Sequence, residues 1–440
     1  MKKNLLVVTQ LSNYDSNGKF ILEADSGWQM CIGRVRELLK LNPELTITIT
    51  GPDDKVGHEQ FITHPYDINP DLWTEKRKRL TYVGLPLIPN ALVSRYDFNW
   101  KEIGDRLLLG WHHTCPHRKF DAVYINDPMH LRNFKALFHV VGKYTPKFFV
   151  HSHFIDNPEC PKFPTEASLW LGQCEAALKA DHNFWQCGTS MKIFFESFKR
   201  DFSFNRLRDV EKKSEPWDDG YSIEEIERPV DFSKLRFTEN EFNSIVRGRT
   251  VVFVPNRIGG MGRSSDYTNC GKFMFEMLPK LRSTRKDDDY VVFAGNPSQK
   301  FTNVELMAMC SQWGYVSLVP NAFNRDEYRY VAAHSDIVLG IYDKDTYGST
   351  ASRECVDLGC IPLWLDVNEY HDIAYETDQS GIVLAHDMDN VIPRLNGVIN
   401  TVRNNPKRVI EIITQLRDVI RNRCSYEKTT LRAARVMGLV

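Results

Sequence analysis

The clearest candidate for chemistry is an acidic residue near the start of a short helix between two apolar runs. The segment from Asp345 to Pro362 follows the apolar run 335–341 and leads into the apolar run 361–365. Amides at a helix start bind phosphate groups, and a carboxylate one turn further can accept hydrogen bonds from ribose hydroxyls, as an acidic residue does in dinucleotide-binding folds. We therefore predict a nucleotide site with Glu354 on the ribose. The residues predicted to surround it are Tyr347, Gly348, Ser349 and Thr350.

A glycine-rich basic loop follows the apolar run 250–254. Glycines such as Gly260 let the backbone approach an anion, and Arg257 and Arg263 can neutralise a diphosphate. Lys272 stands nine residues after Arg263, near the start of the next expected helix. We predict that these residues contact phosphate; the alternative is a loop of solvated arginines.

Three titratable residues stand just past another apolar run, 147–150. They are His151, His153 and Asp156, at a strand end where acid–base groups are expected. His-x-His is also a spacing seen in metal pairs, but no further ligand stands at a suitable spacing. A second group is crowded irregularly on an expected loop: His112, His113, Cys115 and His117. We predict no metal site.

Asp25 stands immediately before the helix that we expect from residue 26. A side-chain oxygen at this position can cap the helix start. The alternative, that this carboxylate is a general base, comes from a resemblance to a known family and not from its position alone. Both interpretations stay open.

These groups follow a regular series of apolar runs. The runs 5–9 and 45–50 enclose a segment, 26–40, whose apolar residues have a helical period. Further strands are expected at 81–83, 121–125 and 147–150, and a second series begins at 250. Alternating strands and helices predict parallel α/β sheets.

The length of 440 residues fits two domains. We predict two Rossmann-like, doubly wound domains facing a central cleft, with the ligand site at the carboxyl ends of the strands. The N-terminal, acceptor-binding domain is expected at 1–245, including an irregular charged excursion at about 200–245. The nucleotide-binding domain is expected at 246–420, and a C-terminal helix at 421–440.

The composition is that of an ordinary globular protein, with 42% hydrophobic and 26% charged residues. The net charge of −1 provides no global field that would attract nucleic acid or a membrane surface. Ten scattered cysteines without a Cys-x-x-Cys pair favour reduced thiols and a cytoplasmic protein. No run approaches the ~18 apolar residues that span a bilayer, so we expect no membrane partner. We expect a monomer.

The segment from Asp345 to Glu354 resembles the C-terminal signature of GT-B glycosyltransferases. Many retaining members carry Glu-x-Phe-Gly and then a second Glu; here the first motif reads Asp345-Thr-Tyr347-Gly348, and Glu354 follows nine residues after Asp345, one more than in the family. The resemblance implies transfer from a UDP-sugar with no strict need for a metal. It also implies that Asn321 borders the base. The altered spacing leaves the choice between retention and inversion open.

The resemblance also assigns roles in the first half of the chain. His153 or Asp156 would face the sugar or the acceptor, and Asp25 matches the place of the base in inverting members. The C-terminal helix would pack back toward the N-terminal domain, as in the family.

The layout is further similar to the bacteriophage enzymes that glycosylate 5-hydroxymethylcytosine in DNA. This implies a double-stranded DNA partner in the host cytoplasm, with base stacking on Trp28 and a contact from His151. The basic cluster that could hold the phosphate backbone is Lys76, Arg77, Lys78 and Arg79. Two alternatives remain: a transferase with a polysaccharide or other saccharide acceptor, and an inactive nucleotide-binding module.

Overall fold

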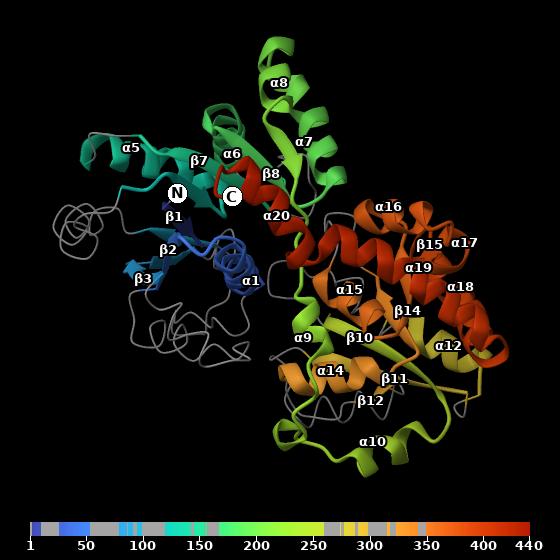
Figure 1. Ribbon diagram of the computed structural model, residues 1–440. Coiled ribbons are helices and arrows are strands. Elements are labelled where there is room, and N and C mark those ends of the chain that lie inside the picture. Colours follow the sequence, from blue (N-terminus) through green and yellow to red (C-terminus); the bar gives the residue numbers. More distant parts are fainter. Residues whose placement is uncertain are drawn as a thin grey trace. The chain divides into compact units, whose positions relative to one another are not determined.

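The computed structural model consists of two units, each built on a parallel sheet (Figure 1). Unit 1 comprises Met1–Ser222 and Cys424–Val440, and unit 2 comprises Ile223–Arg423. The structure describes residues 2–9, 26–52, 79–85, 87–90, 95–98, 119–141, 145–153, 155, 167–258, 273, 277–286, 289–297, 315–316, 323–341 and 349–440.

Unit 1 contains a seven-stranded sheet in the order β3-β2-β1-β6-β7-β8-β9, with every neighbouring pair parallel. Its central strands are buried apolar runs, as both faces of a covered parallel sheet require. The strands are β1 (Lys3–Val8), β2 (Leu45–Pro52), β3 (Leu80–Leu85), β6 (Ala122–Ile125), β7 (Lys147–Ser152), β8 (His182–Trp185) and β9 (Ser214–Pro216). A separate antiparallel pair joins β4 (Leu87–Asn90) to β5 (Arg95–Phe98).

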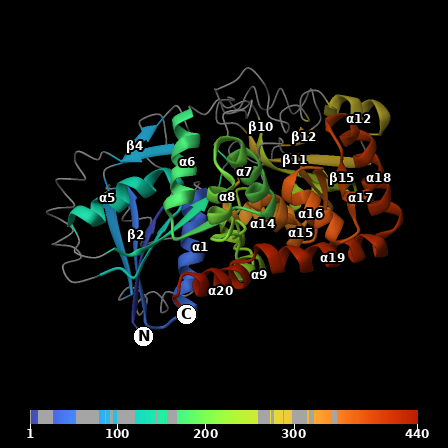
Figure 2. The same cartoon turned by 90° about the horizontal axis from the view of Figure 1, so that it is seen from above.

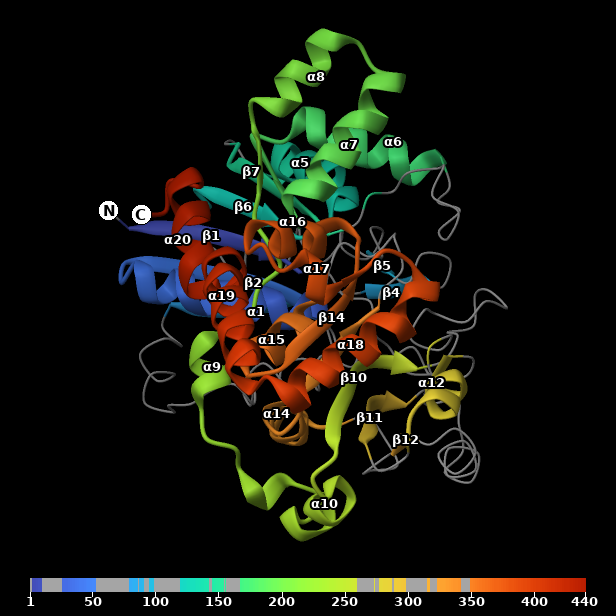
Figure 3. The ribbon, with the colours of Figure 1, turned by 90° about the vertical axis from the view of Figure 1, so that its right-hand side faces the viewer.

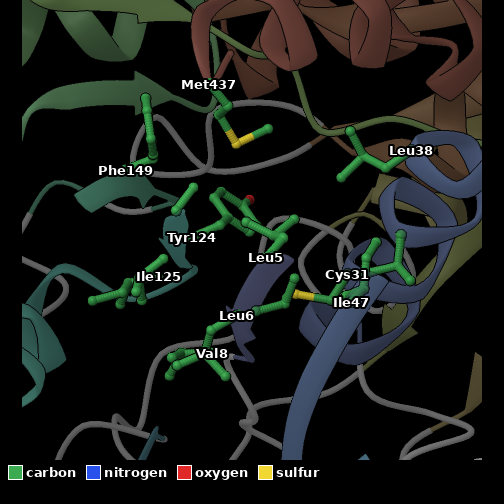
Figure 4. Packing of buried hydrophobic residues seen from close by; sticks show 14 of the residues in the cluster. Leu5, Leu6, Val8, Cys31, Leu38, Ile47, Tyr124, Ile125, Phe149 and Met437 are labelled. Atoms are coloured by element: carbon green, nitrogen blue, oxygen red, sulfur yellow. The ribbon is translucent and has the colours of Figure 1, made fainter. Parts of the chain in front are cut away.

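The helices of unit 1 cover this sheet with apolar side chains from both ends of the chain. Figure 4 shows Met437 near Leu5 and Tyr124, and Cys31 and Leu38 near Ile47. At Gly33 a Cβ would overlap the ring of Tyr426, so the glycine allows α1 and α20 to approach closely (Figure 2). The helices are α1 (Ser26–Leu41), η2 (Pro128–His130), α5 (Leu131–Val141), α6 (Ala167–Lys179), α7 (Gly188–Asp201), α8 (Phe204–Glu211) and α20 (Tyr426–Val436).

Unit 2 contains a six-stranded parallel sheet in the order β12-β11-β10-β13-β14-β15. The strands are β10 (Thr250–Ile258), β11 (Tyr290–Pro297), β12 (Tyr315–Val316), β13 (Ile337–Gly340), β14 (Ile361–Leu365) and β15 (Leu384–Ala385). Figure 3 shows α15 beside β14. The helices are α9 (Ile223–Glu227), η3 (Phe232–Lys234), α10 (Glu239–Val246), α12 (Leu278–Thr284), α14 (Arg325–Ala333), α15 (Thr350–Asp357), α16 (Asn368–Glu376), α17 (Ser380–Val383), η5 (Met388–Asn390), α18 (Val391–Asn404) and α19 (Pro406–Cys424).

The two doubly wound α/β sheets confirm the predicted fold class, and α20 belongs to unit 1, as expected for a C-terminal helix that packs back. Residues 200–245 are more regular than expected, since they contain β9, α8, α9, η3 and α10. The contacts divide the chain at 222/223 rather than at the expected 245/246. The reason is that Glu225 and Arg236 bind side chains of α14. Within the described part of the chain, no helix is long and apolar enough to cross a membrane.

Candidate functional site

The start of α15 lies beside a topological switch point of the unit 2 sheet. The strand order reverses between β10 and β13, and α15 is the helix that comes after β13. In open α/β sheets, ligands bind outside the carboxyl ends of the strands at such a point. Arg257 belongs to the carboxyl end of β10, where its backbone pairs with Asn296. The topology therefore brings two of the predicted donor segments to one sheet edge.

Aromatic packing holds the first turn of α15 against β14. The Trp364 indole donates from Nε1 to Ser352 Oγ at 2.7 Å and stacks on Tyr370, with ring centroids 4.6 Å apart. The Tyr370 hydroxyl accepts from the Ser349 amide at 2.9 Å, and burial raises the pKa of Tyr370, so the phenol stays neutral. The Ser349 N–H thus already has a partner within the protein.

Ion pairs fix both ends of the same helix. Arg353 is fully buried, binds Glu369 and donates to Thr350 Oγ1 at 3.3 Å. At the other end Asp357 accepts from Arg421 Nε at 2.8 and 3.0 Å. A buried charge is tolerated only when it is paired, so these contacts determine how α15 sits on the sheet.

Glu354 projects from this fixed helix and is bound by an arginine. Only 5% of it is exposed. Arg325 Nη1 donates to Glu354 Oε2 and Nη2 donates to Oε1, each at 2.7 Å. Arg325 Nε also binds Glu225. A carboxylate has about four lone-pair sites, so Glu354 retains acceptor capacity on both oxygens.

Ser349, Thr350 and Glu354 therefore lie together in the first half of α15 and at its N-cap, and their contacts with a nucleotide stay a prediction. The structure describes the backbone of Arg257 but not its side chain. The remaining donor-site predictions lie outside the described residues: Gly260, Arg263, Lys272, Asn321, Asp345, Tyr347 and Gly348.

In unit 1 a buried polar cluster lies near the carboxyl ends of β6 and β7. His153 Nε2 is 2.7 Å from Asn126 Oδ1 and 2.9 Å from His151 Nδ1. On its other side His153 Nδ1 is 3.1 Å from Asp219 Oδ2. β6 lies at the switch point of this sheet, between β1 and β7, so the cluster occupies the place where a ligand is expected.

Arg34 carries the positive charge of this cluster. It donates from Nη1 to Tyr124 Oη at 2.7 Å, lies 3.2 Å from His151 Nδ1, and its guanidinium carbon is 4.1 Å from the centroid of Trp217. Its Nη2 is 3.4 Å from Asp219 Oδ1. Burial opposes the charge, but the surrounding polar groups, Tyr124 and Asp219 first, leave the pKa of Arg34 raised.

His151 is a fully buried member of this cluster. Burial, followed by the charges of Arg34 and His153, holds its pKa well below the usual range, so the ring is neutral. Its Nε2 lies 3.0 Å from the Trp217 carbonyl, which requires a hydrogen on that nitrogen. The other nitrogen, Nδ1, is therefore the acceptor in the cluster.

His151, His153 and Asp219 are the one group in the described part of the chain whose ligand atoms are close enough to share a metal ion. The group fits a cation poorly. The buried guanidinium of Arg34 already lies against both His151 and Asp219, and a metal would be repelled by it at this distance. Sequence reasoning overlooked Arg34, Asn126 and Asp219, since these residues are far apart along the chain and no local pattern connects them.

Three residues that were predicted to contact the acceptor make their contacts within unit 1 instead. Trp28 is fully buried in the core, so its ring cannot stack on a base. His151 is also fully buried. Arg79 donates to the carbonyls of Leu39 and Asn42 at the end of α1, so it caps that helix. Asp25, Lys76, Arg77, Lys78 and Asp156 lie outside the described residues.

No family model and no curated protein matches the chain. Solved structures match it over its whole length. HepE from Anabaena in complex with UDP is 12% identical, covers 100% of both chains and superposes with a TM-score of 0.64. The chain has the GT-B fold.

Two other GT-B structures show the same likeness. An α,α-trehalose-phosphate synthase from Burkholderia xenovorans, in complex with glucose-6-phosphate, is 11% identical with a TM-score of 0.60 and covers 99% of this chain and 100% of its own. UGT71G1 from Medicago truncatula, with UDP-glucose, is 9% identical with a TM-score of 0.57 and 99% coverage of both chains. Identities this low establish the GT-B fold alone. Nothing in the comparisons links the chain to phage enzymes that act on hydroxymethylcytosine.

Proposed function

We propose that this protein is a glycosyltransferase that transfers a sugar from a UDP-sugar to a hydroxyl acceptor. The observation that carries the proposal is the placement of Glu354: a buried carboxylate on a fixed helix that follows a switch-point strand of a GT-B fold. The likeness to HepE with UDP and to UGT71G1 with UDP-glucose supports the choice of donor.

In this proposal Glu354 accepts hydrogen bonds from the ribose hydroxyls. Arg257, Gly260, Arg263 and Lys272 bind the diphosphate, which is matched by guanidinium, ammonium and backbone amide donors. The group around the base and the sugar comprises Asn321, Tyr347, Gly348, Ser349 and Thr350. No step in this scheme requires a metal ion.

His153 is the residue of unit 1 that we propose to face the acceptor or the sugar. The bonds to Asn126 and Asp219 orient its ring at the end of β7. Asp156 stands three residues further along the chain and shares the proposed role, and Asp25 is the alternative base. A positioned acid or base of this kind contributes typically ~10²–10⁴-fold to a rate.

For the acceptor we propose a saccharide hydroxyl. Duplex DNA containing 5-hydroxymethylcytosine was the acceptor implied by the phage resemblance. Trp28, His151 and Arg79 were expected to contact this DNA. However, Trp28 and His151 are fully buried, and Arg79 binds a carbonyl at the end of α1. The trehalose-phosphate synthase, whose structure contains glucose-6-phosphate, supports a saccharide instead.

The test is UDP release from a panel of UDP-sugars, alone, with saccharide acceptors and with duplex DNA containing 5-hydroxymethylcytosine. We expect stimulation by a saccharide. Stimulation by the modified DNA alone would replace the saccharide with DNA, and UDP binding without any turnover would indicate an inactive nucleotide-binding module.

A binding measurement tests the donor site separately. Glu354→Ala should weaken UDP binding by at least about tenfold, which is about 1.4 kcal/mol, because a charge-assisted hydrogen bond is lost. Glu411→Ala, in an exposed ion pair of α19, is the control and should bind UDP normally. Unchanged affinity in Glu354→Ala would refute the donor-site assignment.

A further inference from the structure

Unit 2 contains a charged triad in which one arginine binds two carboxylates. Arg325, the first residue of α14, binds Glu225 of α9 through Nε and Glu354 of α15 through Nη1 and Nη2. The side chains of Glu225 and Glu354 are 9% and 7% exposed, and that of Arg325 is 23% exposed. The arginine therefore joins three elements at the predicted ribose position.

The backbone of Arg325 is fixed by a capping box. The Asn324 side chain accepts from the Glu327 amide at 2.9 Å, and Glu327 Oε2 accepts from the Asn324 amide at 2.9 Å. Arg236 then binds the Glu327 carboxylate from Nε at 2.8 Å and from Nη2 at 2.6 Å. These contacts prevent the first turn of α14 from fraying, so Arg325 starts from a defined position.

The side chain of Arg325 is also held. Its guanidinium carbon lies 5.2 Å from the centroid of the Tyr328 ring, and the Tyr328 hydroxyl donates to the Ala351 carbonyl at 2.6 Å. Glu225 holds the Nε edge of the same guanidinium. Arg325 is thus fixed on one edge and on one face, and presents its two terminal nitrogens to Glu354.

Two parallel hydrogen bonds do more than neutralise Glu354. A single contact would let the carboxylate turn about its terminal bond, whereas a bidentate pair fixes its plane. Neighbouring ribose hydroxyls need two acceptor oxygens held at a fixed separation and direction. After binding Arg325, each oxygen of Glu354 still has a lone pair to offer.

We propose that Arg325 is the positioning residue that makes the site selective for ribonucleotides over 2′-deoxyribonucleotides, by fixing the Glu354 carboxylate against both ribose hydroxyls. The inference rests on the proposed function, because it requires UDP to bind with its ribose at Glu354. It goes further in assigning selectivity to a residue that need not touch the ligand.

The variant that separates geometry from charge is Arg325→Lys. Lysine keeps the positive charge between Glu225 and Glu354 but cannot form the bidentate fork. Removing the charge altogether would leave two buried carboxylates facing each other and would destabilise the fold. The double variant Arg325→Lys/Glu225→Gln removes one of the two carboxylates and decides the question if the single variant does not fold.

The experiment is calorimetric titration of the full chain with UDP and with 2′-deoxy-UDP. We expect the wild type to prefer UDP by about tenfold or more, the effect of one charge-assisted hydrogen bond. In Arg325→Lys the preference should fall toward about one. UDP then loses the contacts of both ribose hydroxyls with Glu354, whereas 2′-deoxy-UDP, which has only the 3′-hydroxyl, loses one contact and is weakened less. A general structural loss would weaken both ligands equally. Arg408→Lys, in a surface ion pair with Glu411, should keep the wild-type ratio.

Three outcomes would overturn the inference. An unchanged ratio in Arg325→Lys, with UDP still bound by the wild type, refutes the role of Arg325 and leaves the donor site intact. A rise in UDP affinity would show that Arg325 obstructs the ribose. A wild-type protein that binds no UDP at millimolar concentration would refute the proposed function and this inference together.

Discussion

Replacing Gly340 by alanine tests whether packing at the end of β13 positions α15. A Cβ at Gly340 would overlap Trp364 Cδ1 and lie 2.9 Å from both Trp364 Nε1 and Ser352 Oγ. Trp364 cannot move aside at low cost, because it is fully buried and stacked on Tyr370 at an interplanar angle of 10°. The substitution therefore forces apart the contact that holds the first turn of α15.

The expected loss of stability follows from two contributions. Adding a methyl group to a filled core costs about 1–3 kcal/mol. Separating Trp364 Nε1 from Ser352 Oγ, now 2.7 Å apart, costs about 1 kcal/mol more. The free energy of unfolding should therefore fall by about 2–4 kcal/mol.

Urea unfolding followed by circular dichroism measures this loss, provided that the slope with denaturant stays the same. Gly397→Ala is the matched control. Nothing lies within 4 Å of a Cβ there, and Gly397 is inside α18, so alanine should stabilise by about 0.5–1 kcal/mol. If Gly340→Ala changed stability by less than about 0.5 kcal/mol, as an ordinary surface substitution does, the packing argument would be refuted.

Four further variants test the charged groups. Arg34→Met should destabilise the protein by about 3–5 kcal/mol in urea unfolding, since Asp219 would lose its buried partner. His151 has a lowered pKa, so wild-type stability should decline as the pH falls below about 6.5. His151→Gln should remove this dependence of stability on pH, and an equal dependence in the variant would contradict the role of His151. Burial raises the pKa of Glu225, so the contribution of this group to stability is present below about pH 4.5 and is lost as the pH rises. The stability of Glu225→Gln relative to the wild type should therefore increase toward neutral pH, which thermal unfolding at several pH values measures. Asp219→Asn should lower turnover of a UDP-sugar but leave UDP affinity unchanged, and weakened UDP binding would count against its role beside His153.

The local signals in the sequence were reliable because they depend on neighbouring residues. Buried strands are continuous apolar runs, and the runs 45–50, 250–254 and 361–365 became β2, β10 and β14. The segment around Glu354 was recognisable for the same reason, since a loop, a helix start and a strand follow one another within a short stretch. The prediction that residues 200–245 are irregular was wrong, because short helices such as α9 have too few residues to show a helical period.

Contacts between distant residues were decided only by the tertiary structure. Arg34 meets Asp219 across 185 positions, and Arg325 meets Glu225 across 100. From its sequence neighbours alone, a charged residue is expected to be solvated. Only the fold shows that it is buried with a partner. The same holds for Trp28, whose ring could as well have faced a ligand until the packing of the sheet buried it. The sequence by itself therefore determined the α/β alternation and the helix that carries Glu354. The strand order, the histidine cluster and the arginine that orients Glu354 depend on which elements pack together, and no local pattern encodes that.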